Sequence, residues 1–166
     1  MKRLLGKEQQ IFDDMKKCFT SYGLKIFDEL KKNDQLMIFS KFEYRNYNFG
    51  IAAIYHADGD LVEISTVYTN ISKNKIKPVA ELMNHINSYI MSGHFYVVYS
   101  TGAMSFRTAI HVTDTLNKDD FEWALDQVMS ASYKFFPMII DQIFTEMEPL
   151  EIIKKHLEEE PMEVQP

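Results

Sequence analysis

The order of the secondary-structure elements that the sequence predicts constrains the fold more than any single motif does. Apolar residues recur at helical spacing in three segments, and stretches rich in aromatic and β-branched residues lie between them. The helical segments are residues 11–22, 76–90 and 121–143, and the strand-like stretches are residues 36–45, 49–56, 61–69, 94–100 and 104–112. This order predicts a helix, an antiparallel meander, a second helix, a hairpin and a long final helix.

Local signals indicate where these elements meet. Asp58-Gly59 predicts a two-residue hairpin turn, in which both positions must tolerate a positive φ. Residues 101–103 predict the turn of the second hairpin, and residues 115–119 offer capping side chains for the last helix. Pro137 lies inside the last helical pattern and removes a backbone donor, so we expect a kink there.

The predicted fold class is α+β, with one antiparallel sheet of about six strands and helices packed on one of its faces. A chain of 166 residues suits a single domain with its own core. We place this domain at residues 1–148 and expect an acidic C-terminal tail at residues 149–166, with a short helix in it as an open alternative. Residues 24–30 fit either a short strand or a continued helix.

Charge and composition exclude several classes of protein. The chain has 24 acidic and 18 basic residues, for a net charge of −6, and no dense basic stripe, so we expect no nucleic-acid partner. Cys18 is the only cysteine, and its place on an apolar helix face predicts a buried side chain rather than a disulfide. The first eight residues lack the apolar stretch of a signal peptide, and no window is long enough to span a membrane. We therefore expect a cytoplasmic protein with no membrane partner.

No pattern of side chains predicts a reaction, a cofactor or a metal site. The five histidines lack the spacing of zinc hydrolases, and the six glycines form no phosphate cradle. The acidic residues lie in turns and on helix faces, where they suit capping better than acid catalysis. We therefore expect no enzyme. The alternative is a small-ligand-binding protein or an enzyme that uses a patch of His94, Arg107 and His111, on two strands expected to pair.

The predicted sheet has more apolar surface than one layer of helices can cover. Met37, Phe39 and Ile54 lie on the strand face opposite to the one that carries other large apolar side chains, and such a face needs a cover. The cover is a second copy of the chain, the C-terminal segment or a partner protein. Trp123 points away from the apolar stripe of its helix, which fits an interface anchor or a tail folded over it. Arg107 fits either a partner's carboxylate or the ordinary polar face of a sheet.

Five short motifs carry a resemblance to a known family. They are Tyr22-Gly23-Leu24, Leu82-Met83-Asn84-His85-Ile86-Asn87, Gly93-His94-Phe95, Met104-Ser105-Phe106-Arg107 and Tyr133-Lys134-Phe135-Phe136-Pro137. Through them, residues 8–144 resemble the YbjN-type family of bacterial sensory transduction regulators, whose fold is similar to that of type III secretion chaperones.

The resemblance implies an α-β-α-β-α order, a protein-binding or regulatory role without known catalysis, and a homodimer. Asn87 and Arg107 match recurring positions of the family, and the amide of Asn87 suits a contact that ties its helix to a neighbouring loop. The leading hypothesis is a non-enzymatic, chaperone-like or regulatory protein-binding module with an unidentified protein partner. Its candidate partner-binding residues are Met37, Phe39, Ile54, Trp123 and Arg107.

Overall fold

The structure is a computed structural model that describes residues 6–32, 35–44, 47–68 and 70–157. Within these residues the chain forms four α-helices, one short 3₁₀ helix and six strands. The helices are α1 (Gly6–Ser21), η1 (Lys73–Lys75), α2 (Ile76–Asn87), α3 (Lys118–Phe144) and α4 (Pro149–Leu157). The strands are β1 (Asp28–Lys32), β2 (Gln35–Tyr44), β3 (Tyr47–His56), β4 (Leu61–Val67), β5 (His94–Val97) and β6 (Met104–His111).

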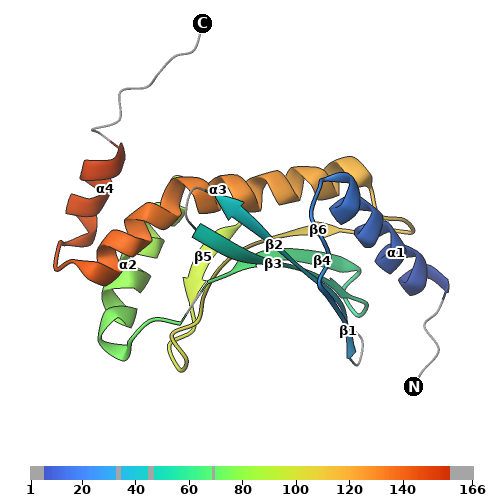
Figure 1. The fold of residues 1–166 in the computed structure, drawn as a ribbon, viewed down its shortest axis with the longest axis horizontal. Coiled ribbons are helices and arrows are strands. Elements are labelled where there is room, and N and C mark those ends of the chain that lie inside the picture. Colours follow the sequence, from blue (N-terminus) through green and yellow to red (C-terminus); the bar gives the residue numbers. More distant parts are fainter. Residues whose placement is uncertain (1–5, 33–34, 45–46, 69, 158–166) are drawn as a thin grey trace, which may run out of the picture.

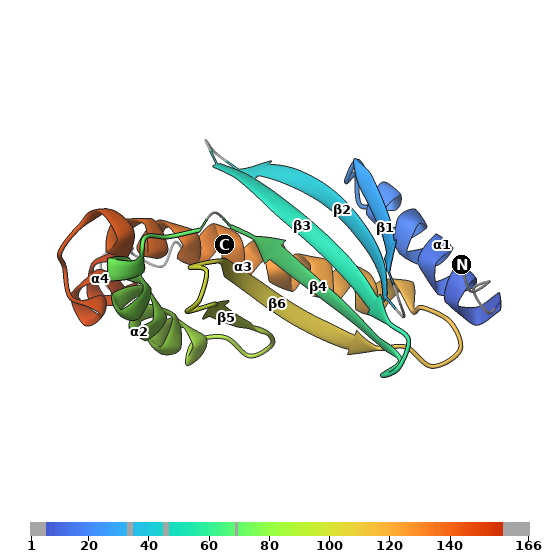
Figure 2. The same cartoon turned by 90° about the horizontal axis from the view of Figure 1, so that it is seen from below.

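The six strands form one antiparallel sheet in the order β1-β2-β3-β4-β6-β5. Figure 1 shows α3 running along one face of this sheet, with α1 near β1 and with α2 and α4 at the opposite end. Figure 2 views the sheet from the other side, where none of the described helices lies in front of the central strands. The predicted α+β class, with helices packed on one face of an antiparallel sheet, is confirmed.

The core lies between the sheet and α3. Side chains alternate between the two faces of a strand, so every second residue of the central strands points toward the helices. Ile38, Ala53 and Ile64 are cross-strand neighbours on β2, β3 and β4, and each is fully buried. Burial of a branched apolar side chain of this size stabilises the fold by roughly 1.5–3 kcal/mol.

An aromatic cluster holds the C-terminal half of α3 against β3 and the end of β4. The ring centroid of Phe136 lies 4.9 Å from that of Phe49 and 5.0 Å from that of Tyr68. The Tyr68 hydroxyl forms a 2.8 Å hydrogen bond with the Ser132 hydroxyl, and its burial raises the pKa of Tyr68 to about 12. Because the only polar atom of the Tyr68 side chain is bonded, the ring is buried without an unsatisfied group.

The connection between β3 and β4 differs from the predicted two-residue turn. The loop spans residues 57–60, and the positive φ, 46°, belongs to Asp60 rather than to the Asp-Gly pair. The Asp60 carboxylate accepts hydrogen bonds from the Tyr55 hydroxyl at 2.9 Å and from the Lys7 ammonium at 2.8 Å. These tertiary contacts fix the loop and override the local preference of Asp-Gly for a tight turn.

The long helix α3 begins within the predicted capping segment. The Asn117 side chain accepts from the backbone N–H groups of Asp119 at 2.9 Å and Asp120 at 3.4 Å, which satisfies two of the first unpaired donors of the helix. The helix continues through Pro137. Figure 1 shows that the C-terminal part of α3 bends toward α2 and α4.

Residues that the sequence left ambiguous or assigned to the tail acquire defined structure. The segment 24–30 is not helical, and its last three residues belong to β1. Within the predicted tail, α4 contacts α2 and α3, and Ile152 is fully buried between them. The rest of the predicted acidic tail, residues 158–166, lies outside the described residues.

Candidate functional site

One face of the sheet is left uncovered by the described helices, and we call it the open sheet face. The register aligns its side chains in rows across the strands. The first row is Leu30, Met37, Ile54, Glu63 and Ala109, and the second is Asp28, Phe39, Ala52, Ser65 and Arg107. Both rows are apolar on β2 and β3. Glu63 on β4 is the polar member of the first row, and Ser65 and Arg107 make the second row polar on β4 and β6.

The apolar part of the open sheet face lies on β1, β2 and β3. Met37, Phe39 and Ile54 are half-buried, because neighbouring strands about 4.8 Å apart bring such side chains into mutual contact. Leu30 at one border is 44% exposed, and Val67 at the end of β4 is 53% exposed. A contiguous apolar surface of this kind marks an interaction site more often than singly scattered apolar residues do.

Arg107 is the centre of the polar part. Its Nε–H donates to His94 Nε2 at 3.1 Å, and its guanidinium lies 4.9 Å from the centroid of the Tyr96 ring. A guanidinium nitrogen lies 3.7 Å from a carboxylate oxygen of Glu63, so the ion pair is loose. The guanidinium is thus oriented by three neighbours while 44% of the side chain stays exposed to solvent.

The surroundings of the His94 imidazole favour its neutral form. Burial and then the positive charge of Arg107 lower the pKa of His94 below 6.5, and the negative charge of Glu63 opposes this shift. A neutral imidazole nitrogen can accept the Arg107 hydrogen bond, whereas a protonated ring cannot.

Glu63 connects the polar and apolar parts. Its carboxylate lies 4.0 Å from His56 Nε2, and His56 Nδ1 lies 3.1 Å from the amide nitrogen of Gln35 on β2. A series of polar contacts therefore crosses five strands, from Gln35 through His56, Glu63 and Arg107 to His94. This series of contacts orients the five side chains, and none of the five is a nucleophile paired with a base.

The structure brings four of the five predicted partner-binding residues to one face. Met37, Phe39, Ile54 and Arg107 lie on the open sheet face, in two adjacent rows. Trp123 does not join them, because it lies on α3, which packs on the other face, and it is 48% exposed there.

The alternative patch of histidines and arginine does not assemble as a single site. His94 and Arg107 are cross-strand neighbours in contact, but His111 pairs with Leu61 at the other end of β6. Arg107 and His111 are four positions apart along the strand, which corresponds to roughly 13 Å. Sequence reasoning missed Glu63 and Tyr96, because their proximity to Arg107 depends on the register between strands.

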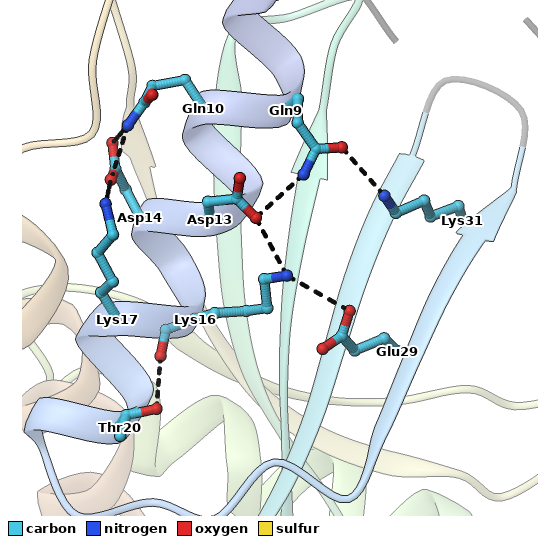
Figure 3. Close-up of polar contacts among 9 residues, drawn as sticks. All are labelled: Gln9, Gln10, Asp13, Asp14, Lys16, Lys17, Thr20, Glu29 and Lys31. Atoms are coloured by element: carbon cyan, nitrogen blue, oxygen red, sulfur yellow. Dashed lines mark hydrogen bonds and ion pairs between the residues drawn. The ribbon is translucent and has the colours of Figure 1, made fainter. Parts of the chain in front are cut away.

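The outer surface of α1 carries a second group of polar contacts, shown in Figure 3. Lys16 lies 3.1 Å from Asp13 and 3.7 Å from Glu29 of β1, and Lys31 of β1 donates to Gln9 at 3.2 Å. These contacts hold β1 against α1. An open depression along α1 is lined by residues of this group and its neighbours. Its charged residues are already paired, Lys16 with Asp13 and Lys17 with Asp14.

Two kinds of feature are absent from the described residues. No group of three or more histidine, cysteine, aspartate or glutamate side chains is placed to hold a metal ion. None of the helices combines the length and the apolarity required to cross a bilayer.

The fold defines a class of α+β proteins with this open antiparallel sheet. A chain in the crystal structure of the ExsC–ExsE complex matches with a TM-score of 0.56 and 12% identity, over 82% of this chain and 97% of that one. An uncharacterized protein from Methanothermobacter thermautotrophicus matches with a TM-score of 0.56 and 14% identity, over 79% and 97% of the two chains. At these identities the likeness establishes the fold.

The family follows from the sequence. The model of the YbjN family, described as "Putative bacterial sensory transduction regulator", matches residues 12–141, and the chain belongs to this family. The structure of YbjN from E. coli, described as "a putative transcription regulator", has a TM-score of 0.51 and 12% identity, over 77% of this chain and 87% of that one. No protein with a curated description matches the chain in sequence. The predicted family resemblance is confirmed.

Proposed function

We propose that this chain is a protein-binding module, chaperone-like or regulatory, that acts through its open sheet face rather than through catalysis. The observation that carries the proposal is the continuous apolar surface formed by Leu30, Met37, Phe39 and Ile54 on the uncovered side of the sheet. The family's description as a regulator supports this role, and so does the likeness to a chain from a two-protein complex.

The chemistry of the open sheet face indicates the kind of partner. Apolar side chains that dock on Met37, Phe39 and Ile54 gain roughly 25 cal/mol for each Å² of apolar surface removed from water. Arg107 is preoriented and half exposed, and its ion pair with Glu63 is loose at 3.7 Å, so its guanidinium can bind a second carboxylate. The preferred partner is a protein segment with apolar side chains and an acidic residue about two strands away from them.

Photo-crosslinking tests the proposal at the level of single positions. The amino acid p-benzoylphenylalanine replaces Met37 or Ile54 in the full chain produced in its own cells, and the control carries it at the exposed Ser130 of α3. We expect the two open-face positions to capture the same protein and the Ser130 control to capture little of it.

A second set of variants links capture to the chemistry of the face. Phe39→Asp places a charge in the apolar part, and Arg107→Glu reverses the charge of the polar part. Each is expected to reduce capture at Ile54 by about tenfold, which corresponds to about 1.4 kcal/mol of binding free energy. Equal capture from Ser130, or capture that neither variant changes, would show that the partner binds elsewhere.

The proposal includes a homodimer, which the family resemblance implies. The edge strand β1, rather than the open sheet face, carries a self-complementary charge pattern that suits this dimer.

A further inference from the structure

Strand β1 leaves one edge of the sheet unpaired. It pairs with β2 on one side only, and no other described strand pairs with it. All five of its residues are exposed, and Figure 2 shows the strand at the border of the sheet. The N–H and C=O groups that such an edge leaves without a neighbouring strand are a site where another strand can add.

The sequence of β1 is complementary in charge to its own reverse. It reads Asp28, Glu29, Leu30, Lys31 and Lys32, with two acidic residues before the central leucine and two basic residues after it. In an antiparallel pair of two such strands centred on Leu30, Asp28 faces Lys32 of the second copy and Glu29 faces Lys31. Four pairs of opposite charge then flank one pair of leucines.

We propose that two copies of this chain associate by antiparallel pairing of β1 with β1 of the second copy, centred on Leu30. The resulting two-fold axis is perpendicular to the sheet, so each copy contributes the same residues and the contact closes as a dimer. The pairing of β1 is inferred from the position and sequence of this strand alone. The role of the open sheet face in the dimer rests on the proposed function.

The charge pattern favours this register over its neighbours. Side chains keep their faces only if the register shifts by two residues at a time. A shift of two residues in either direction places Glu29 against Glu29 or Lys31 against Lys31, and like charges directly opposite each other are destabilising. The pattern therefore selects one pairing of the strand with itself.

The same pattern argues for a second copy rather than for an unrelated strand. Lysines on an edge strand normally oppose pairing, because a foreign strand leaves their charges without partners. A second β1 supplies an acidic residue opposite each lysine. The lysines therefore disfavour pairing with other strands but permit pairing with β1 of a second copy.

Pairing of this kind also extends the proposed binding surface. Leu30 belongs to the same open-face row as Met37 and Ile54. With Leu30 opposite Leu30 of the second copy, the apolar row continues across the junction and doubles in length. Both open sheet faces lie on the same side, because the two-fold axis is perpendicular to the sheet. A partner can therefore contact both copies at once.

Two of the four charged residues allow a test that leaves the contacts between β1 and α1 intact. Glu29 and Lys31 already contact Lys16 and Gln9 of α1, as Figure 3 shows. Asp28 accepts a hydrogen bond only from the neighbouring backbone N–H of Glu29, and Lys32 has no ion pair within the described part of the chain. Substitutions at positions 28 and 32 therefore change the proposed interface without breaking contacts to the helices.

Analytical ultracentrifugation of the full chain over a concentration series measures the association. An interface of one short strand is small, so we expect a weak dimer that forms in the micromolar to millimolar range. Its mass is twice the 19.5 kDa of one chain. Asp28→Lys and Lys32→Asp each place two like-charged pairs at the junction, and each is expected to raise the dimer Kd by roughly tenfold.

Combining the two substitutions gives the decisive comparison. A mixture of Asp28→Lys and Lys32→Asp chains restores opposite charges in both pairs, and so does the double variant in a single chain. Both are expected to dimerise as the unmodified chain does. Matched controls carry the same charge changes at exposed positions of α2 and η1, at the end of the molecule opposite β1, as Glu81→Lys and Lys73→Asp, and are expected to have no effect.

Three outcomes would overturn the inference: a chain that stays monomeric into the millimolar range, single variants that dimerise normally, and a mixture that fails to recover. Circular dichroism confirms that each variant is folded. Crosslinking at Ile54 is measured on the unmodified chain and on the same variants. An unmodified chain that stays monomeric but still captures its partner overturns the β1 pairing alone. Lost capture with a retained dimer counts against the proposed function alone.

Discussion

The side-chain amide of Asn87 forms hydrogen bonds with both backbone polar groups of Phe95. Its Nδ2 donates to the Phe95 carbonyl oxygen at 3.0 Å, and the Phe95 N–H donates to its Oδ1 at 2.8 Å. Asn87 is the last residue of α2, and Phe95 lies in β5 at the other border of the sheet. The amide thus replaces a neighbouring strand at this position and ties the helix to a strand rather than to the predicted loop.

This relationship predicts the cost of removing the amide. Asn87→Ala leaves the N–H and C=O of Phe95 without partners in a partly buried setting, so we expect a loss of about 1–3 kcal/mol in the free energy of unfolding. Urea denaturation followed by circular dichroism measures it. The matched control is Asn84→Ala, at an exposed position of the same helix, where a change within about 0.5 kcal/mol is expected. Equal effects at the two positions would contradict the assignment.

A pair of glycines gives a test of backbone geometry. Gly102 has a φ of +73°, and a Cβ built on it would lie 2.3 Å from the carbonyl oxygen of Ile71. Gly102→Ala must therefore displace backbone, and we expect it to destabilise the fold by about 2–4 kcal/mol. A Cβ on Gly59 meets nothing closer than 3.9 Å, so Gly59→Ala is expected to be neutral within about 0.5 kcal/mol. Thermal unfolding of the two variants compares them directly.

The attachment of α4 depends on pH through Asp141. Hydrogen bonds from Lys155 and His156 of α4 hold the pKa of Asp141 below 3.8, and partial burial opposes the shift. Because the pKa is lower in the folded chain, this stabilisation is present above about pH 4 and is lost as the pH falls through the lowered pKa.

Asp141→Asn is therefore expected to lower the free energy of unfolding by about 1 kcal/mol at pH 7. This value is kept small because Asp141 and its partners on α4 are partly exposed to solvent. The difference between the variant and the unmodified chain should shrink toward zero in strongly acidic buffer. Guanidinium unfolding at several pH values measures it, with Asp114→Asn in an exposed loop as the control. A difference that stays constant with pH would show that the carboxylate charge is not the cause.

In the polar part of the open sheet face, the pKa of His94 is predicted to depend on the charges of Arg107 and Glu63. Burial, together with the charge of Arg107, lowers the pKa of His94, and Glu63 opposes the shift. Arg107→Gln should therefore raise the pKa of His94 toward 6.5, whereas Glu63→Gln should lower it further. NMR titration of the imidazole ring signals measures both. Shifts in the same direction for the two variants would contradict the arrangement of charges.

The fold could be predicted because its signals are local. The alternation of Ile38 and Ile51 with Met37 and Ile54 reports which strand faces are apolar, and the helical stripes report which sides of the helices are buried. The predicted Asp-Gly turn was wrong because Lys7 and Tyr55 hold Asp60, and Lys7 is remote in sequence. The local turn preference of a sequence is overridden where a side chain that is distant in sequence fixes the loop.

The candidate site could be predicted only in part. Period-two alternation places Met37 and Phe39 on one face, and the same rule applied to β3 includes Ile54. It does not reveal that Glu63 and Tyr96 lie beside Arg107, or that Trp123 lies on the other side of the molecule. Those relations depend on strand order and register, which short-range patterns leave open.

The sequence by itself determined the type and order of the main helices and strands, the excess of apolar surface on the strands, the membership of the family and the charge pattern of residues 28–32. These follow from residues that are close together along the chain. Only the tertiary structure decided that Arg107 meets His94 but not His111, that Asn87 pairs with β5, and that β1 is an edge. The physical reason is that register and strand order depend on the packing of the whole core, so they are set by many distant contacts at once.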